Sequence, residues 1–230
     1  MAGLQVHTVE TAYAVTQAEI KAWCKIDSTD DDATVALIEQ AVHSWAKEYT
    51  HRSITPVTYN LFLDTLYDTT NPIPEGMYIG YDRNTSRRTI ELPKSPASSV
   101  THIKSYDDAD SATTFASSNY YVDTMSMPSR IVLRTGSNFP SALRVANSLE
   151  IRYVAGATAV PYDIKSACLE YASYLFEHRG DLIDGRRILA PTSATQLLEP
   201  YVIKSLSTHP YRTMTAGSVY FLGNSNDSLG

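Results

Sequence analysis

The spacing of apolar residues changes twice along this chain, and this change constrains the fold more than any single motif. Before residue 50, apolar side chains recur three or four positions apart, at Val35, Ile38, Val42, Trp45 and Tyr49. This spacing is typical of a helix with one buried face. From Pro56 to about Tyr153 the period shortens to two and turn residues multiply, which indicates strands, and a helical pattern returns after Pro161. The expected fold is α+β: a bundle of three to four helices with an inserted small antiparallel β-sheet and an extended C-terminal arm.

Two helices are expected to open the chain. Thr16, followed three residues later by Glu19, forms a capping box, in which each residue satisfies a free amide of the other at a helix start. The predicted first helix runs from Thr16 to about Lys25. Its apolar positions include Ile20 and Trp23, which we therefore expect to face the core.

Three consecutive aspartates, within the run from residue 28 to 32, precede the second predicted helix. A calcium loop would need alternating acidic residues and a central glycine, and the run has neither. We favour a structural interpretation, because Ser, Thr and Asp side chains accept hydrogen bonds from free amides at a helix start. The helix ends near Tyr49, and its polar residues fall largely off the apolar stripe: Glu39, Gln40, His43, Lys47 and Glu48.

The middle of the chain contains five segments with the pattern of strands. They are residues 57–63, 100–106, 120–123, 130–133 and 149–153. The third and fourth are separated by a short turn, so we expect them to pair as a hairpin. Residues 64–89 form a long excursion with several prolines, glycines and tyrosines. A loop of this length is usually functional or disordered.

Two further helices are predicted after the strand region. Pro161 suits the first turn of a helix, and Asp163 places a negative charge near the positive end of the helix dipole. This helix extends to about Arg179. A short fourth helix is expected from Ser193 to about Tyr201.

Composition and motifs argue against several classes of function. The chain has 19 Lys and Arg against 25 Asp and Glu, a formal net charge of −6, whereas proteins that bind DNA tightly show a basic surplus. Cys24 and Cys168 form no metal-ligand or disulfide pattern, and we interpret both as buried free thiols. The six histidines share no ligand spacing, and no nucleotide-binding or hydrolase motif occurs. We expect no catalytic residue, cofactor, metal site, signal peptide or membrane span.

The last segment differs in composition from the rest of the chain. Residues 205–230 are rich in Ser, Thr, Asn and Gly, and by themselves bury too little to offset their ordering entropy. We divide the chain into a body, residues 1–204, with helices in 16–50 and 161–201 and a β insertion in 56–154, and an arm, residues 205–230. The arm is either a loose terminus or a segment that orders on a partner. Its candidate partner-binding residues are Tyr211, Arg212, Met214, Val219, Tyr220, Phe221 and Leu222.

Several short motifs follow one another in a fixed order. They are a helix end with Glu48, Thr50 and Arg52, the turn Leu92-Pro93-Lys94-Ser95-Pro96, the strand end Tyr153-Val154-Ala155-Gly156, and the helix start Pro161-Tyr162-Asp163-Ile164-Lys165-Ser166-Ala167. In this order the chain, over about residues 8–200, resembles the head–tail connector (adaptor) proteins of long-tailed bacteriophages and gene transfer agents. The first motif has one residue fewer between Glu and Thr than the family pattern. The excursion at 64–89 and the tail after residue 204 also depart from it.

The resemblance implies a structural protein of the virion neck, assembled in the host cytoplasm, and not an enzyme. Family members form a homo-oligomeric ring, usually of twelve copies, that docks on the portal protein and bridges to a stopper or tail-terminator protein. DNA passes through the ring without specific binding, and a C-terminal arm reaches onto the portal. Two other interpretations stay open: another neck component, such as a stopper or tail-completion protein, and a small uncharacterised enzyme.

Overall fold

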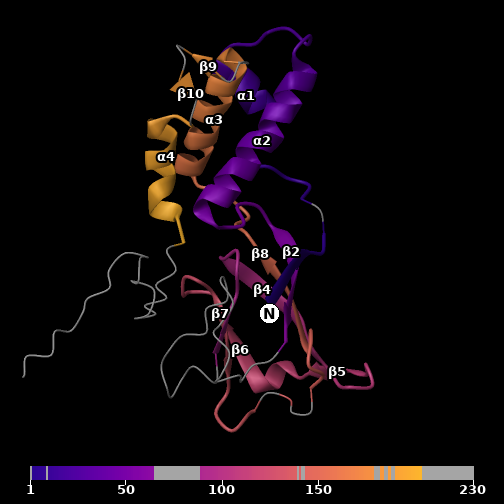
Figure 1. Ribbon diagram of the computed structural model, residues 1–230. Coiled ribbons are helices and arrows are strands. Elements are labelled where there is room, and N and C mark those ends of the chain that lie inside the picture. The colour runs from indigo at the N-terminus through magenta and orange to yellow at the C-terminus, as the bar shows by residue number, and fades with distance from the viewer. Residues whose placement is uncertain are drawn as a thin grey trace, which may run out of the picture.

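The computed structural model has two units, one made of helices and one made of strands (Figure 1). It describes residues 2–8, 10–64, 89–138, 140, 143–178, 182–183, 186–187 and 190–203. The helices are α1 (Gln17–Cys24), α2 (Asp32–Thr50), α3 (Tyr162–Glu177) and α4 (Thr192–Leu198), and α4 continues into a 3-10 turn, Glu199–Tyr201. The chain begins in the strand unit with β1 (Ala2–Val6), passes through α1 and α2, re-enters the strand unit after α2 and returns to the helices at α3. All strands of this unit except β1 therefore form an insertion between α2 and α3.

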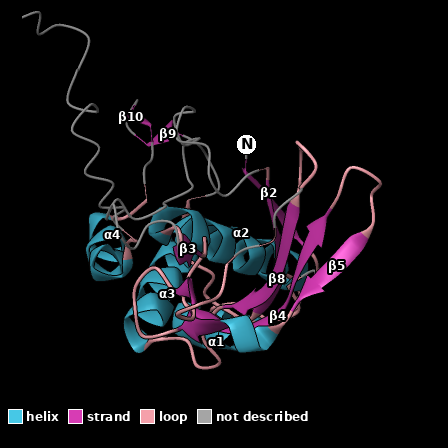
Figure 2. Ribbon diagram, turned by 90° about the horizontal axis from the view of Figure 1, so that it is seen from below, coloured by secondary structure: helices cyan, strands magenta, loops and turns pink. Residues whose placement is uncertain are grey.

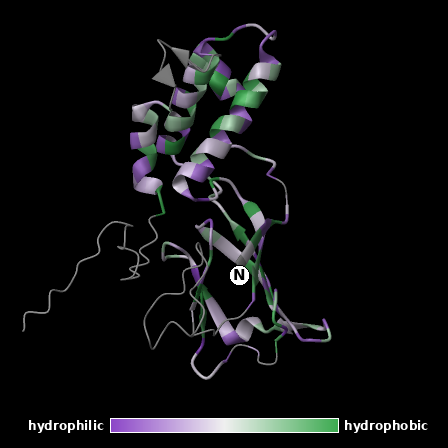
Figure 3. Ribbon diagram, viewed as in Figure 1, coloured by the Kyte–Doolittle hydropathy of each residue, from purple (hydrophilic) through white to green (hydrophobic). Residues whose placement is uncertain are grey.

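The helical unit has its own hydrophobic core, to which all four helices contribute. Ile20 of α1, Val42 of α2 and Cys168 of α3 are fully buried in it, together with Ala194 and Leu198 of α4. Each helix shows an apolar side and a polar side (Figure 3). The capping box at Thr16 and Glu19 is present. The four helices predicted from spacing and caps are therefore confirmed, with ends that differ by one to three residues.

Three side chains of this unit lie differently from the expectation. Trp23 was expected to face the core, but its side chain is 51% exposed, because α1 ends one residue later and only Ile20 of this helix is buried. Glu39 and His43 were expected off the apolar stripe, yet both are buried. The N-terminal segment covers them and supplies partners: Gln17 donates to Glu39 at 3.1 Å, and the amide of Ala14 donates to His43 Nδ1 at 3.1 Å.

The strand unit contains two antiparallel sheets and a short 3-10 turn, Ser117–Asn119. The larger sheet has the order β1 (Ala2–Val6), β2 (Val57–Leu63), β8 (Leu149–Ala155), β4 (Ala97–Tyr106), β5 (Ala112–Phe115). The smaller one has the order β3 (Thr89–Glu91), β7 (Arg130–Leu133), β6 (Tyr120–Asp123). The two-residue strands β9 (Leu182–Ile183) and β10 (Arg186–Arg187) lie between α3 and α4 in the chain and pair only with each other. Figure 2 shows β2, β8, β4 and β5 side by side as one twisted layer.

The two larger sheets share a second hydrophobic core. Alternate residues of β2 and β8 point into it, such as Leu61 and its register partner Ile151, and Ile131 of β7 meets them from the smaller sheet. The intervening residues of β8, Glu150 and Arg152, lie on the outer face of the larger sheet. One apolar and one polar face is the usual arrangement of an antiparallel sheet.

Two expectations about the strands were wrong. The chain opens with strand β1 and not with a helix, and the strands form two principal sheets where one was expected. β1 was missed because its described side chains are exposed at the sheet edge, so its sequence carries no burial pattern. It is held by pairing with β2, for example Leu4 opposite Leu61. The 120–123/130–133 hairpin is confirmed as β6 and β7.

Some expectations fall outside the described residues. These are the arm at 205–230 with its seven candidate residues, and nearly all of the 64–89 excursion. The division into body and arm therefore stays a prediction. Among the helices described, none is long and apolar enough to cross a membrane.

Candidate assembly surfaces

Three of the four motifs that carry the family resemblance meet at the junction between the two units. In the turn from Leu92 to Pro96, the hydroxyl of Ser95 donates to the carbonyl of Leu92 at 2.8 Å and accepts from the amide of Ser129 at 2.8 Å. The carbonyl of Pro93 accepts the hydroxyl of Tyr153, on β8, at 2.7 Å. Ser95 and Leu92 are fully buried, so this turn is a fixed part of the fold.

Gly156 ends β8 at the same junction. Its amide donates to the carbonyl of Pro96 at 2.8 Å, and its φ is +112°, a conformation that L side chains rarely adopt. A Cβ atom here would lie 2.0 Å from the carbonyl oxygen of Thr55. The glycine is therefore required by a close approach of two backbones where the strand unit meets the helical unit.

The end of α2 forms the third part of the junction. The Thr50 hydroxyl donates to the carbonyl of Ala46 at 2.7 Å, and Lys94 of the Leu92–Pro96 turn donates to Glu48 at 3.1 Å. The guanidinium of Arg52 lies over the ring of Tyr201, 5.7 Å from its centroid. Three motifs that are far apart in the sequence thus contact one another. These contacts fix the position of the helices relative to the sheets.

The outer face of the larger sheet carries a connected polar cluster. Glu150 of β8 accepts a hydrogen bond from the hydroxyl of Tyr106 at 2.6 Å, and lies 3.2 Å from His102 Nε2 and 3.3 Å from Arg152. Burial alone would raise the pKa of Glu150, but the bonds from Tyr106 and His102 outweigh it and lower the pKa. Arg152 also donates to Asn60 of β2 at 2.8 Å. The cluster presents a hydrogen-bonded polar surface, which suits contact with solvent or a polar partner.

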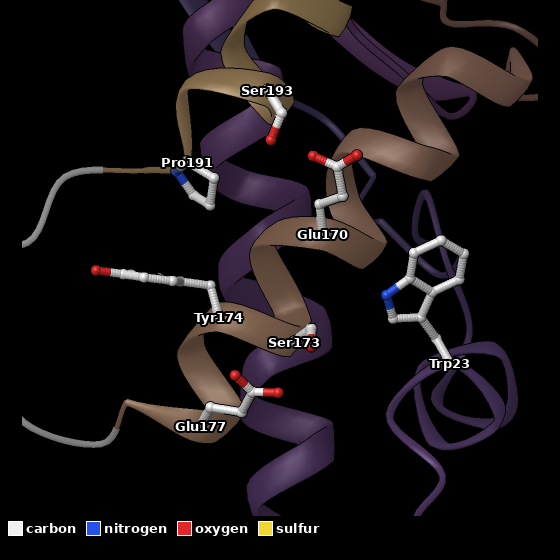
Figure 4. Close-up of a pocket in the computed structure, with 7 residues that line it drawn as sticks. All are labelled: Trp23, Glu170, Ser173, Tyr174, Glu177, Pro191 and Ser193. Carbon is white, nitrogen blue, oxygen red and sulfur yellow. The ribbon is translucent and has the colours of Figure 1, made fainter.

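A shallow groove crosses the helical unit between α1, α3 and α4, and we call it the α1–α3–α4 groove. Its volume is about 280 Å³. Trp23 borders it on α1, Glu170, Tyr174 and Glu177 line it on α3, and Pro191 lies before α4 (Figure 4). Oε2 of Glu170 is buried and has no hydrogen-bond partner in the described part of the protein. Such an unsatisfied buried oxygen calls for an explanation, for example a ligand group that binds there.

The chemistry beside the groove does not favour a nucleophile. Burial raises the pKa of the Cys24 thiol, and the charge of Glu177 raises it further, against a hydrogen bond from Ser173 that lowers it. Burial likewise raises the pKa of Cys168 to about 12. Both cysteines are free, and neither environment favours a reactive thiolate. The prediction that both are buried is confirmed for Cys168, whereas Cys24 is only partly buried because it lies at the exposed end of α1. The groove is shallow, whereas a small enzyme would be expected to have a deep pocket with converging polar groups.

The turn between β6 and β7, residues 124–129, is a second exposed feature, and we call it the β6–β7 turn. Met125 is 94% exposed and Met127 is 47% exposed. Asp123 fixes the turn by accepting hydrogen bonds from the amides of Met125 and Ser126, from the Ser126 hydroxyl and from Arg130 Nε. The bonds from Ser126 and Arg130 lower the pKa of Asp123 to about 2. The turn thus exposes an apolar side chain on a backbone that hydrogen bonds to Asp123 hold in place.

None of these surfaces is among the sites predicted from the sequence. Its seven candidate residues all lie in the arm, outside the described residues. No group of three His, Cys, Asp or Glu side chains that could hold a metal ion occurs in the part of the chain that the structure describes. The groove could not be predicted from the sequence, because Trp23, which borders it, has the helical spacing of a residue that faces the core. The two methionines flanking Ser126, in a predicted turn, were a usable signal of an exposed apolar surface.

Comparisons with known proteins find a match in structure alone. No protein-family model matches the sequence, and no curated protein matches it. A chain from the neck of an empty gene transfer agent (GTA) particle, computed with C6 symmetry, has a TM-score of 0.66 at 19% identity, over 89% of this chain and 98% of that chain. A chain from the virion of a native GTA particle has a TM-score of 0.66 at 18% identity, over 89% of this chain and 97% of that chain. A chain from the neck of a native GTA particle, computed with C12 symmetry, has a TM-score of 0.63 at 19% identity, over 89% of this chain and 98% of that chain. At these identities the likeness establishes a shared fold.

Proposed function

We propose that this protein is a structural subunit of the virion neck in a tailed bacteriophage or gene transfer agent, and that it has no catalytic role. Within the neck, it acts as the head-to-tail adaptor. Copies of it form a ring, usually of twelve copies in the related family, and this ring docks on the portal protein. The ring bridges to the stopper or tail-terminator protein, and DNA passes through its lumen.

The observation that carries this proposal is the extent of the shared fold. The likeness covers nearly the full length of chains from GTA necks and virions, so it includes the helical unit, the strand unit and their arrangement. Two of those necks were computed with C6 and C12 symmetry, which supports a ring of identical copies. The junction residues support it too, because the motifs that resemble the adaptor family are the ones that fix this arrangement.

The charge of the chain is compatible with a DNA channel. Each copy carries a formal net charge of −6. A surface without a basic surplus releases few counterions on contact with DNA and so binds it weakly. A ring of such copies would let DNA slide through without holding it.

The arm at residues 205–230 is proposed to contact the portal. Its apolar residues sit among small polar ones, a composition suited to a segment that orders on a partner's sheet edge or groove. The residues proposed to make this contact are Tyr211, Arg212, Met214, Val219, Tyr220, Phe221 and Leu222.

A stopper or tail-completion protein is the second candidate, and the two-sheet core favours it. Such proteins are expected to be richer in strands. Here the strand unit has a hydrophobic core of its own, made of sixteen buried residues, in addition to the core of the helical unit. The two roles differ in position along the neck. An adaptor contacts the portal, whereas a stopper lies one layer further from the head.

The test is to assemble particles without this protein and examine them by electron microscopy. We expect DNA-filled heads and separate tails that do not join, with joining restored when the protein is added back. A reconstruction of the restored neck then distinguishes the two roles by the layer in which the chain lies. Normal joining in its absence would contradict a neck function.

A further inference from the structure

We propose that the α1–α3–α4 groove is a docking site for a second copy of this chain, and that the β6–β7 turn of the second copy enters it. The proposal deepens the neck function and rests on it, because a ring needs one face of each copy to bind a different face of the next. It assigns those two faces: the groove on the helical unit and the turn on the strand unit.

The groove has the chemistry of a site for an apolar side chain with a cation beside it. Trp23, 51% exposed, and Tyr174 supply aromatic surface, and Glu170 and Glu177 supply two carboxylates from one side of α3. Figure 4 shows the Glu170 carboxylate between Trp23 and Ser193. Its buried Oε2 has no hydrogen-bond partner among the described residues, so an incoming donor would satisfy it. At about 280 Å³ the groove falls just below the roughly 300–1,000 Å³ typical of small-molecule pockets, a size suited to one or two side chains.

The β6–β7 turn presents the complementary groups. Met125, 94% exposed, offers a flexible thioether that packs well against aromatic rings. Arg130 follows on β7, with a side chain that is 46% exposed, and brings a guanidinium to the same end of the hairpin. Because Asp123 already fixes the backbone of the turn, little conformational entropy is lost when it binds.

The position of the turn also suits a contact with a helical unit. Ser129, at its end, donates its amide to Ser95 and accepts from the amide of Ala97, so the turn is held beside the junction with the helices. The groove lies at the other end of the helical unit, where α1 and α3 end and α4 begins (Figure 1). The turn of one copy is therefore too far from its own groove, and only a second copy can bring the two surfaces together.

The first test measures self-association of the full chain by sedimentation velocity over a wide range of protein concentration. Met125→Ser removes the apolar tip, and Glu170→Gln with Glu177→Gln removes the charge of the groove. We expect each change to weaken association by roughly tenfold or more, as for central interface residues. Val145→Ser and Asp108→Asn are the matched controls, since Val145 is 88% exposed and Asp108 is an exposed acid elsewhere on the strand unit. They should associate like the wild type.

The second test changes the charges across the contact. Glu177→Arg alone should weaken association, because it places like charges together, and Glu177→Arg combined with Arg130→Gln should restore part of it, because Gln removes the like charge and can still donate to Asp123. A wild type that stays monomeric at every concentration overturns the proposal. So does equal association of the Met125→Ser and Val145→Ser proteins, or a double variant no better than Glu177→Arg. These outcomes leave the neck function standing if particles still require the protein for joining, so the two proposals fail separately.

Discussion

Single residues at the junction show how a backbone contact can dictate an amino acid. Gly156 combines a φ of +112° with a position where a Cβ would lie 2.0 Å from the Thr55 carbonyl oxygen. Gly136 has a φ of +85°, yet no atom lies within 4 Å of where its Cβ would be. A substitution at Gly136 would therefore cost only the free energy of the strained backbone conformation. A substitution at Gly156 would cost this strain and also the free energy of a steric clash.

We predict that Gly156→Ala lowers the free energy of unfolding by about 3 kcal/mol, because strain and a backbone clash add together. Gly136→Ala should cost about 1 kcal/mol, the strain alone. Urea unfolding of both variants measures the difference. Equal losses at the two positions would show that the junction relaxes around the added methyl group.

A second residue-scale feature is the polar cluster that fastens the N-terminal segment to α2. Lys47 Nζ lies 2.9 Å from Glu10 Oε1, and His43 Nε2 lies 3.3 Å from Glu10 Oε2. Burial by itself raises the pKa of Glu10, but the hydrogen bonds from His43 and Lys47 and the charge of Lys47 prevail and lower it to about 2. The carboxylate is thus more acidic in the folded chain than in the unfolded one.

This sign fixes the expected pH dependence. A lowered folded-state pKa gives stability that is present above pH 4.5, the ordinary value, and is lost as pH falls toward 2. Glu10→Gln should therefore be less stable than the wild type near neutral pH, and the gap should narrow between pH 4.5 and 2. Unfolding free energies measured for both proteins across this range check it. A constant gap would mean that Glu10 contributes by packing and not by its charge.

At the scale of elements, α1 depends on its ends more than on its length. It has only eight residues, too few to be stable alone in water. Its start is fixed by Thr16 and Glu19, whose side chains each accept from the other's amide, at 3.2 and 2.8 Å. Glu19 also pairs with Lys165 of α3 at 2.7 Å, so the cap ties α1 to its neighbour.

We predict that Thr16→Ala lowers the stability by about 1 kcal/mol, the usual cost of losing an N-cap. Thr16→Ser keeps the hydroxyl and should change the stability by only a few tenths of a kcal/mol. Thermal unfolding of the two variants gives the comparison. If both lose the same amount, the methyl group of Thr16 matters more than its hydrogen bond.

At the scale of the whole molecule, two hydrophobic cores are joined by one hydrogen-bonded junction. The sheet core and the helical core have separate residues, and the chain crosses between the two units after β1, after α2 and after β8. The last described segment returns to the same place, where the amide of Ile203 donates to the carbonyl of Thr50. Residues 205–230 begin just beyond this bond.

Deleting residues 205–230 should therefore leave the body folded, with an unchanged unfolding temperature, because the deletion removes none of the described contacts. We expect the shortened protein to fail to join portal-bearing heads to tails. Circular dichroism and an in vitro joining assay measure the two effects. Normal attachment by the shortened protein would show that the assignment of the arm to the portal is wrong.

The sequence by itself determined what depends on neighbours along the chain. The 3–4 spacing in α2, the capping box of α1 and the β6–β7 hairpin all follow from interactions within a few residues, and each was predicted. Tertiary structure alone decided the sheet order, which pairs Leu63 with Leu149, and the exposure of Trp23. It also brought Gly156, Pro96 and Thr55 into contact. The physical reason is that burial and strand pairing depend on surfaces contributed by distant segments, and local spacing carries no information about which segment will cover a given face.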